Sequence, residues 1–344
     1  MSRKLLSYTA LGLILGNAAI ADVPKVAVDI APVHSLVSRV MEGVGSPKLI
    51  IPAGASPHEY SLRPSEAKSL QDADMVIWMG EDLAPWMENS IEKLAKNAEV
   101  ITLLEASETK LLDFREGALF EEHDHGDHDD HDDHDDHDDH DKDHDDHDDH
   151  DDHDKDHDDH DDHDDHDDHA GHDHGEHDPH AWLSIENAQT WLNLVAGKLS
   201  AADPENAGVY FGNAAAARSE IEELSKEVNS ILDPVRGRSF VVFHDAYQYF
   251  ETSFDFPASG AISLGDATDP SASRIAEIQG RVREEGINCV LSEPQYNPNL
   301  VETVLEGTDA KTGVIDPLGV NLEPGSKLYG DLIRNMAKSL AGCL

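Results

Sequence analysis

The sequence predicts an α/β protein of two lobes, each with a mostly parallel four-stranded sheet flanked by helices, joined by one long rigid helix. Three observations lead to this fold class. Short apolar, β-branched runs alternate with amphipathic stretches in both halves of the 344-residue chain, as in parallel α/β sheets. One long helical pattern separates the two halves. A very polar tract interrupts the first half and adds nothing that can form a core.

The first 21 residues are predicted to be a signal peptide that is cleaved off. Arg3 and Lys4 form a basic start, Leu5–Leu15 is apolar, and Ala19-Ile20-Ala21 fits a cleavage site. A membrane anchor is the alternative, but the run is shorter than the ~18 residues a spanning helix needs. We therefore expect a soluble protein exported to a Gram-negative periplasm.

The first lobe is predicted to extend from residue 22 to residue 202. Its strand candidates are short apolar runs, at Val26–Ala31, Lys48–Pro52, Met75–Trp78 and Val100–Leu104. Amphipathic stretches between them predict helices, at Ser35–Gly43, Ser65–Asp72 and Ala84–Asn97.

The linking helix is predicted between residues 203 and 234. Asp203-Pro204-Glu205 supplies a capping residue, a proline in the first turn and an acid near the positive end of the helix dipole. Apolar residues then recur at spacings of three and four, at Tyr210, Ala214, Ala217, Ile221, Leu224, Val228 and Ile231. About 30 helical residues span roughly 45 Å, so this helix is expected to tie the lobes together and limit hinge opening.

The second lobe is predicted between residues 235 and 344. Its strand candidates are Phe240–Phe243, Ala258–Leu264, Cys289–Leu291 and Lys311–Ile315. Its helix candidates are Tyr247–Phe254, Ser271–Glu285, Asn297–Glu306 and Tyr329–Ala341. This lobe also holds both cysteines, Cys289 and Cys343. An oxidising compartment favours a disulfide between them, and two buried free thiols are the alternative.

The formal charge of −47 is unevenly distributed along the chain. Residues 121–178 hold 33 acidic residues, two lysines and 19 of the 23 histidines, mostly as Asp-Asp-His repeats. This composition predicts a disordered insertion in the first lobe. So negative a chain also excludes nucleic acid as a partner, because phosphate contacts need clustered Lys and Arg, and it argues against anionic membrane surfaces.

Four histidines remain outside that tract. His58 follows a predicted strand, His180 precedes a helix that Ser184 is placed to cap, and His244 ends the strand that opens the second lobe. The fourth, His34, is interpreted as an ordinary buried or pocket-lining residue. Asp316 also ends a predicted strand. Because ligands of open α/β sheets bind beyond the carboxyl ends of strands, three imidazoles and a carboxylate or water predict a tetrahedral zinc site here.

Four segments of the chain resemble motifs of the cluster A-I substrate-binding proteins of ABC metal importers. They are Pro57-His58-Glu59-Tyr60, Asp178-Pro179-His180-Ala181-Trp182, Phe243-His244-Asp245-Ala246-Tyr247 and Ile315-Asp316-Pro317-Leu318-Gly319. The Asp/His insertion and the two cysteines point to the zinc-specific ZnuA type. The resemblance implies a non-enzymatic monomer that holds Zn²⁺ as transported ligand between its lobes and delivers it to a membrane permease.

The same resemblance implies a set of metal ligands: His58, His180, His244 and Asp316. The fourth ligand stays open between Asp316 and water. Some relatives carry a glutamate directly before the first histidine, where this chain has Pro57. A histidine at position 244 favours zinc over manganese, which prefers oxygen ligands. Asp178 and Asp245 are candidates to orient the ligand imidazoles by accepting a hydrogen bond from the ring nitrogen that does not bind the metal.

The tract at 121–178 is predicted to collect or buffer zinc at low affinity, with a solvated spacer as the alternative. Two other functions were weighed for the whole protein. A secreted zinc hydrolase requires a substrate pocket beside the metal. A periplasmic metal-storage or chaperone protein requires that tight binding reside in the tract.

Overall fold

The computed structural model describes residues 23–115, 120, 177–263, 270–296 and 298–344. The predicted signal peptide and residues 121–176 of the Asp/His tract lie outside these ranges. All described residues belong to one compact unit. Within the described ranges, no helix combines the length and apolar character that crossing a membrane requires.

The first sheet contains four parallel strands in the order β2-β1-β3-β4. They are β1 (Val26–Val28), β2 (Lys48–Leu49), β3 (Met75–Trp78) and β4 (Glu99–Thr102). The helices that follow them are α1 (Ala31–Val40), α2 (Pro64–Gln71) and α3 (Pro85–Leu94). Some strands are shorter than predicted. The prediction followed apolar runs, and apolar residues such as Ile50 and Ile51 are buried in the core although they lie beyond the end of β2.

The second sheet repeats that strand order as β6-β5-β7-β8, again all parallel. Its strands are β5 (Phe240–His244), β6 (Ala261–Ser263), β7 (Cys289–Ser292) and β8 (Lys311–Val314). Its helices are α6 (Gln248–Phe254), α7 (Ala272–Glu284), α8 (Pro298–Leu305) and α9 (Leu328–Cys343). The predicted strand at 258–264 is reduced to β6, and its last residue lies outside the described ranges. The α/β fold class is thereby confirmed.

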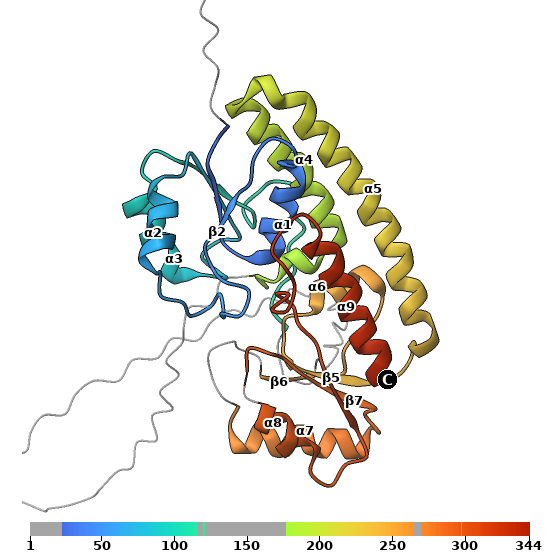
Figure 1. The fold of residues 1–344 in the computed structure, drawn as a ribbon. Helices are drawn as coiled ribbons and strands as arrows, with labels where there is room; N and C mark the ends of the chain where they lie inside the picture. Colours follow the sequence, from blue (N-terminus) through green and yellow to red (C-terminus); the bar gives the residue numbers. More distant parts are fainter. Residues whose placement is uncertain (1–22, 116–119, 121–176, 264–269, 297) are drawn as a thin grey trace, which may run out of the picture. The chain divides into compact units, whose positions relative to one another are not determined.

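Two long helices, α4 (Ile185–Ala202) and α5 (Ala207–Leu232), pack side by side (Figure 1). Ser184 caps α4 by accepting a hydrogen bond from the Asn187 N–H at 3.1 Å. On α5 the predicted apolar positions are buried up to Val228, but the last one is Leu232 rather than Ile231. One 3₁₀ turn precedes α5 and another follows it. The residue boundaries proposed for the lobes and the linking segment stay a prediction.

One apolar core extends through both sheets. It includes β1 and β3, the buried faces of α1, α4, α5 and α9, and one face of β5. The other face of β5 packs with α7 and α8 in a smaller cluster, because alternate residues of a strand point to opposite sides. Cys289 of β7 and Cys343 of α9 form a disulfide beside this core, so the free-thiol alternative is wrong.

Candidate metal centre

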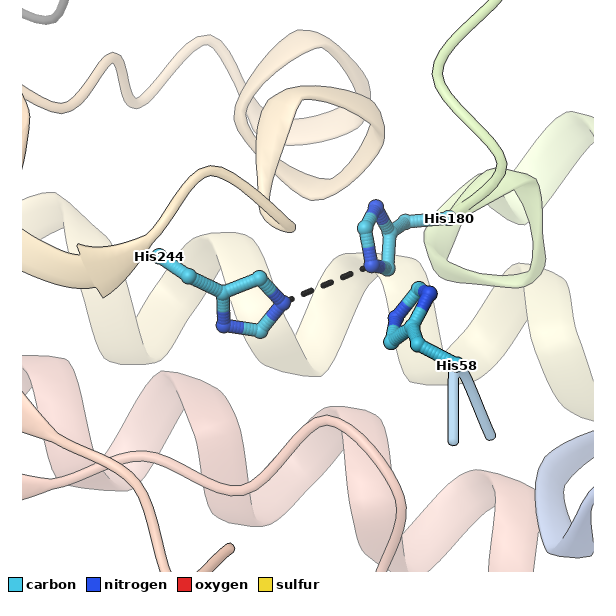
Figure 2. Close-up of side chains that lie close together, drawn as sticks. All are labelled: His58, His180 and His244. Carbon is cyan, nitrogen blue, oxygen red and sulfur yellow. Dashed lines mark hydrogen bonds between the residues drawn. The ribbon is translucent and has the colours of Figure 1, made fainter. Parts of the chain in front are cut away.

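Three of the four predicted ligands, His58, His180 and His244, lie together. One ring nitrogen from each lies within 4.8 Å of the other two, and the Nε2 atoms of His180 and His244 are 3.4 Å apart. Figure 2 shows the three rings facing a common point. His180 and His244 are buried, whereas His58 is partly exposed.

Different elements place these histidines. His244 is the last residue of β5, so its side chain stands at the carboxyl edge of the second sheet. His58 lies on the loop between β2 and α2, and His180 directly precedes a 3₁₀ turn that leads into α4. The Trp182 indole of that turn donates to the Pro317 carbonyl at 2.9 Å, which fixes the turn against the loop after β8.

A buried carboxylate holds the Nδ1 atom of each buried histidine. Asp178 Oδ1 lies 2.7 Å from His180 Nδ1, and Glu293 Oε1 lies 2.7 Å from His244 Nδ1. Because a carboxylate accepts hydrogen bonds, Nδ1 carries the hydrogen and Nε2 keeps its lone pair for a metal. Asp178 was among the predicted orienting residues. Glu293 was missed, although its position directly after β7 was a usable signal.

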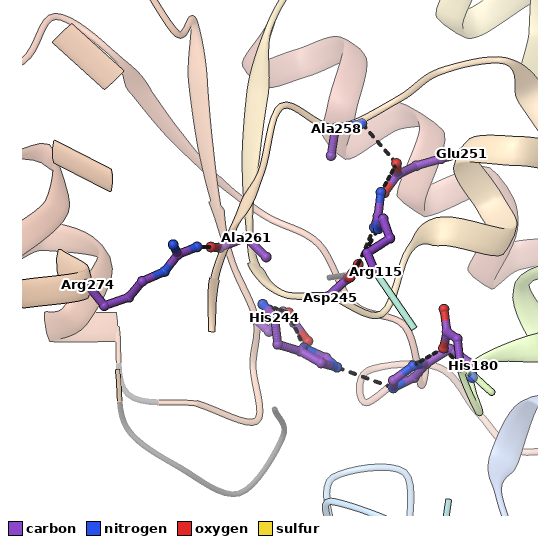
Figure 3. Close-up of polar contacts among 10 residues, drawn as sticks. Arg115, His180, His244, Asp245, Glu251, Ala258, Ala261 and Arg274 are labelled. Atoms are coloured by element: carbon purple, nitrogen blue, oxygen red, sulfur yellow. Dashed lines mark hydrogen bonds and ion pairs between the residues drawn. The ribbon is translucent and has the colours of Figure 1, made fainter. Parts of the chain in front are cut away.

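Asp245 contacts an arginine instead of a histidine. Arg115 donates to Asp245 and to Glu251, the latter at 2.8 and 3.1 Å (Figure 3). Burial raises the pKa of Asp245 even though Arg115 acts in the opposite direction. The hydrogen bonds from Arg115 to Asp245 anchor the segment that leads toward the Asp/His tract next to His244, a predicted ligand.

Asp316 follows β8 and binds the backbone of its own loop. Its carboxylate accepts hydrogen bonds from the N–H groups of Leu318, Gly319 and Val320 at 2.7–3.0 Å, and from Gln295 Nε2 at 3.3 Å. It is not part of the three-histidine group. The choice between Asp316 and water as fourth ligand stays a prediction.

His34 lies apart from this group. Its Nε2 is 3.2 Å from the Pro47 carbonyl, and burial lowers its pKa. Of the two interpretations of His34, as a buried residue or as a pocket-lining residue, these contacts agree with the buried residue.

The cavity at the three histidines is small and is lined by both polar and apolar side chains. Besides the three histidines and Glu293, it is lined by Ser56, Pro57, Trp182, Gln295, Tyr296, Pro317 and Leu318. Its free volume of about 10 Å³ is room for roughly one water molecule or ion. An organic substrate does not fit beside a metal here, which counts against the zinc hydrolase.

Known proteins resemble this chain over nearly its whole length. Residues 26–343 match the family model described as "ZnuA: Zinc-uptake complex component A periplasmic". The high-affinity zinc uptake system protein ZnuA of Paracoccus denitrificans is 44% identical over 342 residues, covering 98% of each chain. The protein of that name from Haemophilus influenzae is 36% identical over 342 residues, covering 99% of each.

Solved structures share the fold. A crystal structure of ZnuA covers 94% of this chain and 99% of its own, with a TM-score of 0.68 and 18% identity. The Zn(II)-bound ZnuA-like domain of Streptococcus pneumoniae AdcA covers 93% of this chain and 98% of its own, with a TM-score of 0.63 and 22% identity.

Proposed function

This chain belongs to the ZnuA family of periplasmic zinc-uptake components, and we propose that it captures Zn²⁺ through His58, His180 and His244. It is a high-affinity zinc-binding protein and a carrier rather than an enzyme. The observation that carries the ligand assignment is the convergence of three imidazole nitrogens on a space for one ion.

The spacing of two of the nitrogens supports tetrahedral zinc. Two ligands that each lie about 2.05 Å from a tetrahedral centre are roughly 3.3 Å apart. The Nε2 atoms of His180 and His244 are separated by 3.4 Å, which is close to that value. Three nitrogen ligands also suit Zn²⁺ better than Mn²⁺. The fourth position is proposed for Asp316 or water.

The remaining parts of the function are proposals that rest on family membership and composition. The zinc-loaded protein delivers its ion to the permease of an ABC importer as a monomer, after removal of residues 1–21. The Asp-Asp-His repeats collect zinc weakly and supply the tight site, with a solvated spacer as the alternative.

Metal competition on the full chain tests the ligand assignment. We expect wild type to retain one tightly bound zinc against a chelator, and the variant with His58, His180 and His244 changed to alanine to lose it, as measured by elemental analysis. Deletion of residues 123–174 is the matched comparison and should remove only weak sites. Tight zinc in the triple variant would favour the storage protein instead and overturn the proposal.

A further inference from the structure

We propose that His180 and His244 form a preformed pair of ligands that binds zinc first, that His58 then closes the site, and that Tyr249 is the positioning residue that keeps the pair together. This order rests on the proposed zinc ligands and follows from which parts of the fold hold each histidine.

The segment that carries His180 is hydrogen-bonded on both sides of the histidine by side chains of the C-terminal half. The Tyr249 hydroxyl on α6 donates to the Asp178 carbonyl at 2.9 Å, and the Tyr329 hydroxyl on α9 donates to the Trp182 carbonyl at 3.1 Å. Both tyrosines are buried. Although His180 comes before α5 in the sequence, its main chain is therefore fixed to helices that come after α5.

Tyr249 connects the two buried ligands. His244 ends β5, and Tyr249 is the second residue of α6, the next helix. Its hydroxyl holds the carbonyl of Asp178, whose carboxylate accepts hydrogen bonds from the His180 ring at 2.7 Å and from the His180 backbone N–H at 2.9 Å. The same hydroxyl accepts the Leu112 N–H at 2.9 Å, so it is both donor and acceptor and its orientation is fixed. One hydroxyl thus sets the position of His180 relative to the strand that carries His244.

The rings of His180 and His244 already have the spacing that a zinc ion needs. Their Nε2 atoms are 3.4 Å apart, which is close to the separation of two ligands on a tetrahedral zinc centre, and Figure 2 shows these atoms facing each other. Both rings are buried, and a carboxylate holds each Nδ1 atom. Because the pair is ordered before the ion arrives, little conformational freedom is lost when zinc binds to it.

His58 is held by another part of the fold. It lies on the loop between β2 and α2 and is partly exposed. The Trp86 indole on α3 donates to the Pro57 carbonyl at 2.8 Å, which ties this loop to the first half of the chain. The His58 backbone N–H donates to Ser56 of the same loop at 3.3 Å. A partly exposed ligand on a loop loses more freedom on binding than the buried pair does, so we expect it to join the ion last.

Single alanine variants of the three histidines in the full chain test the order of binding. Zinc is supplied from chelator buffers, and tryptophan fluorescence reports binding at the site, because the Trp182 and His180 ring centroids are 5.2 Å apart. We expect His58→Ala to retain more zinc affinity than His180→Ala or His244→Ala, since only His58→Ala keeps the pair. Equal losses in the three variants would overturn the order.

Tyr249→Phe tests the positioning role, because it removes the hydroxyl and keeps the ring. Loss of a group that supports a ligand costs about 10–100-fold in metal affinity, and we expect a loss near the lower end, since Tyr249 acts on His180 through Asp178. The same loss should appear in the His58→Ala background, where the pair is intact. It should largely disappear in the His180→Ala background, where the pair is already broken. A purely structural role would change both backgrounds equally.

Tyr210→Phe is the matched control, because Tyr210 is also a buried tyrosine and its hydroxyl donates to Asp203, which is not a proposed ligand. Its zinc affinity should equal that of wild type. Wild-type affinity in Tyr249→Phe, or equal losses in the two histidine backgrounds, would overturn the positioning role. If Tyr249→Phe does not fold, Tyr329→Phe replaces it with the same expectations. Tight zinc in the triple histidine variant would instead overturn the ligand assignment itself.

Discussion

The two sheets share one strand order, yet their carboxyl edges carry different chemistry. In the first sheet, Asp29 follows β1 and accepts the N–H of Met79, which follows β3, at 2.6 Å. In the second sheet, Glu293 follows β7 and accepts hydrogen bonds from His244 at the end of β5. Each link joins the two central strands of its sheet through one buried carboxylate.

The difference between these links lies in what remains after the strands are joined. Both oxygens of Asp29 are used by backbone N–H groups, those of Ile30 and Met79. Glu293 instead gives one oxygen to both the ring and the backbone N–H of His244. The same strand order therefore carries a purely structural link in the first sheet and supports a proposed metal ligand in the second.

The largest effect is expected from replacing, one at a time, the buried histidines His34 of α1 and His244 of β5. His244→Ala should abolish tight zinc binding, because it removes a ligand at the edge of the second sheet. His34→Ala removes a buried histidine outside the site and should leave the zinc affinity unchanged. Chelator competition on both variants provides the measurement. Equal zinc affinities of the His244→Ala and His34→Ala variants would contradict the assignment of His244 as a zinc ligand.

The next effect is expected from the disulfide, which links β7 of the second sheet to α9. Cys289 and Cys343 are 54 positions apart, and opening such a loop costs up to about 4 kcal/mol of unfolding free energy in the chain-entropy model. Cys289→Ala/Cys343→Ala should show this loss in denaturant titration of the zinc-free protein. A loss below about 1 kcal/mol would mean that the packing of α9 carries the stability by itself.

The last prediction concerns the pH dependence of stability and the Asp29 carboxylate of the first sheet. Burial raises the pKa of Asp29 to about 7, from 3.8, although the backbone N–H groups act in the opposite direction. The unfolded chain then releases this proton at lower pH than the folded protein. The stability contributed by neutral Asp29 is therefore complete below about pH 4 and lost as the pH rises to about 7.

Asp29→Asn should remove this part of the pH dependence, as measured by urea unfolding at several pH values between about 4 and 8. The slope that it removes is at most about 1.4 kcal/mol per pH unit. An unchanged slope in the Asn variant would show that the Asp29 carboxylate is ionised throughout this range.

The sequence was sufficient for the strand and helix order and for the three clustered histidines, because apolar periodicity and strand ends are local features. It was insufficient for Glu293, whose role depends on the register between β5 and β7 and thus on tertiary structure. Asp245 adjoins His244, yet its side chain turns to Arg115, a partner 130 positions away. Sequence proximity therefore identified Asp178, which holds the His180 ring, but not Glu293, which holds the His244 ring.

The shared core has a consequence for how the protein melts. Because residues of both sheets belong to the same buried cluster, neither sheet keeps its packing when the other comes apart. We therefore expect the described fold to unfold in a single calorimetric transition. A bound ion raises the melting temperature of every part of the protein that unfolds together with its site. Zinc bound at the three proposed ligands is therefore expected to stabilise strands that lie far from the site, so that zinc occupancy is measurable as the melting temperature of the whole fold.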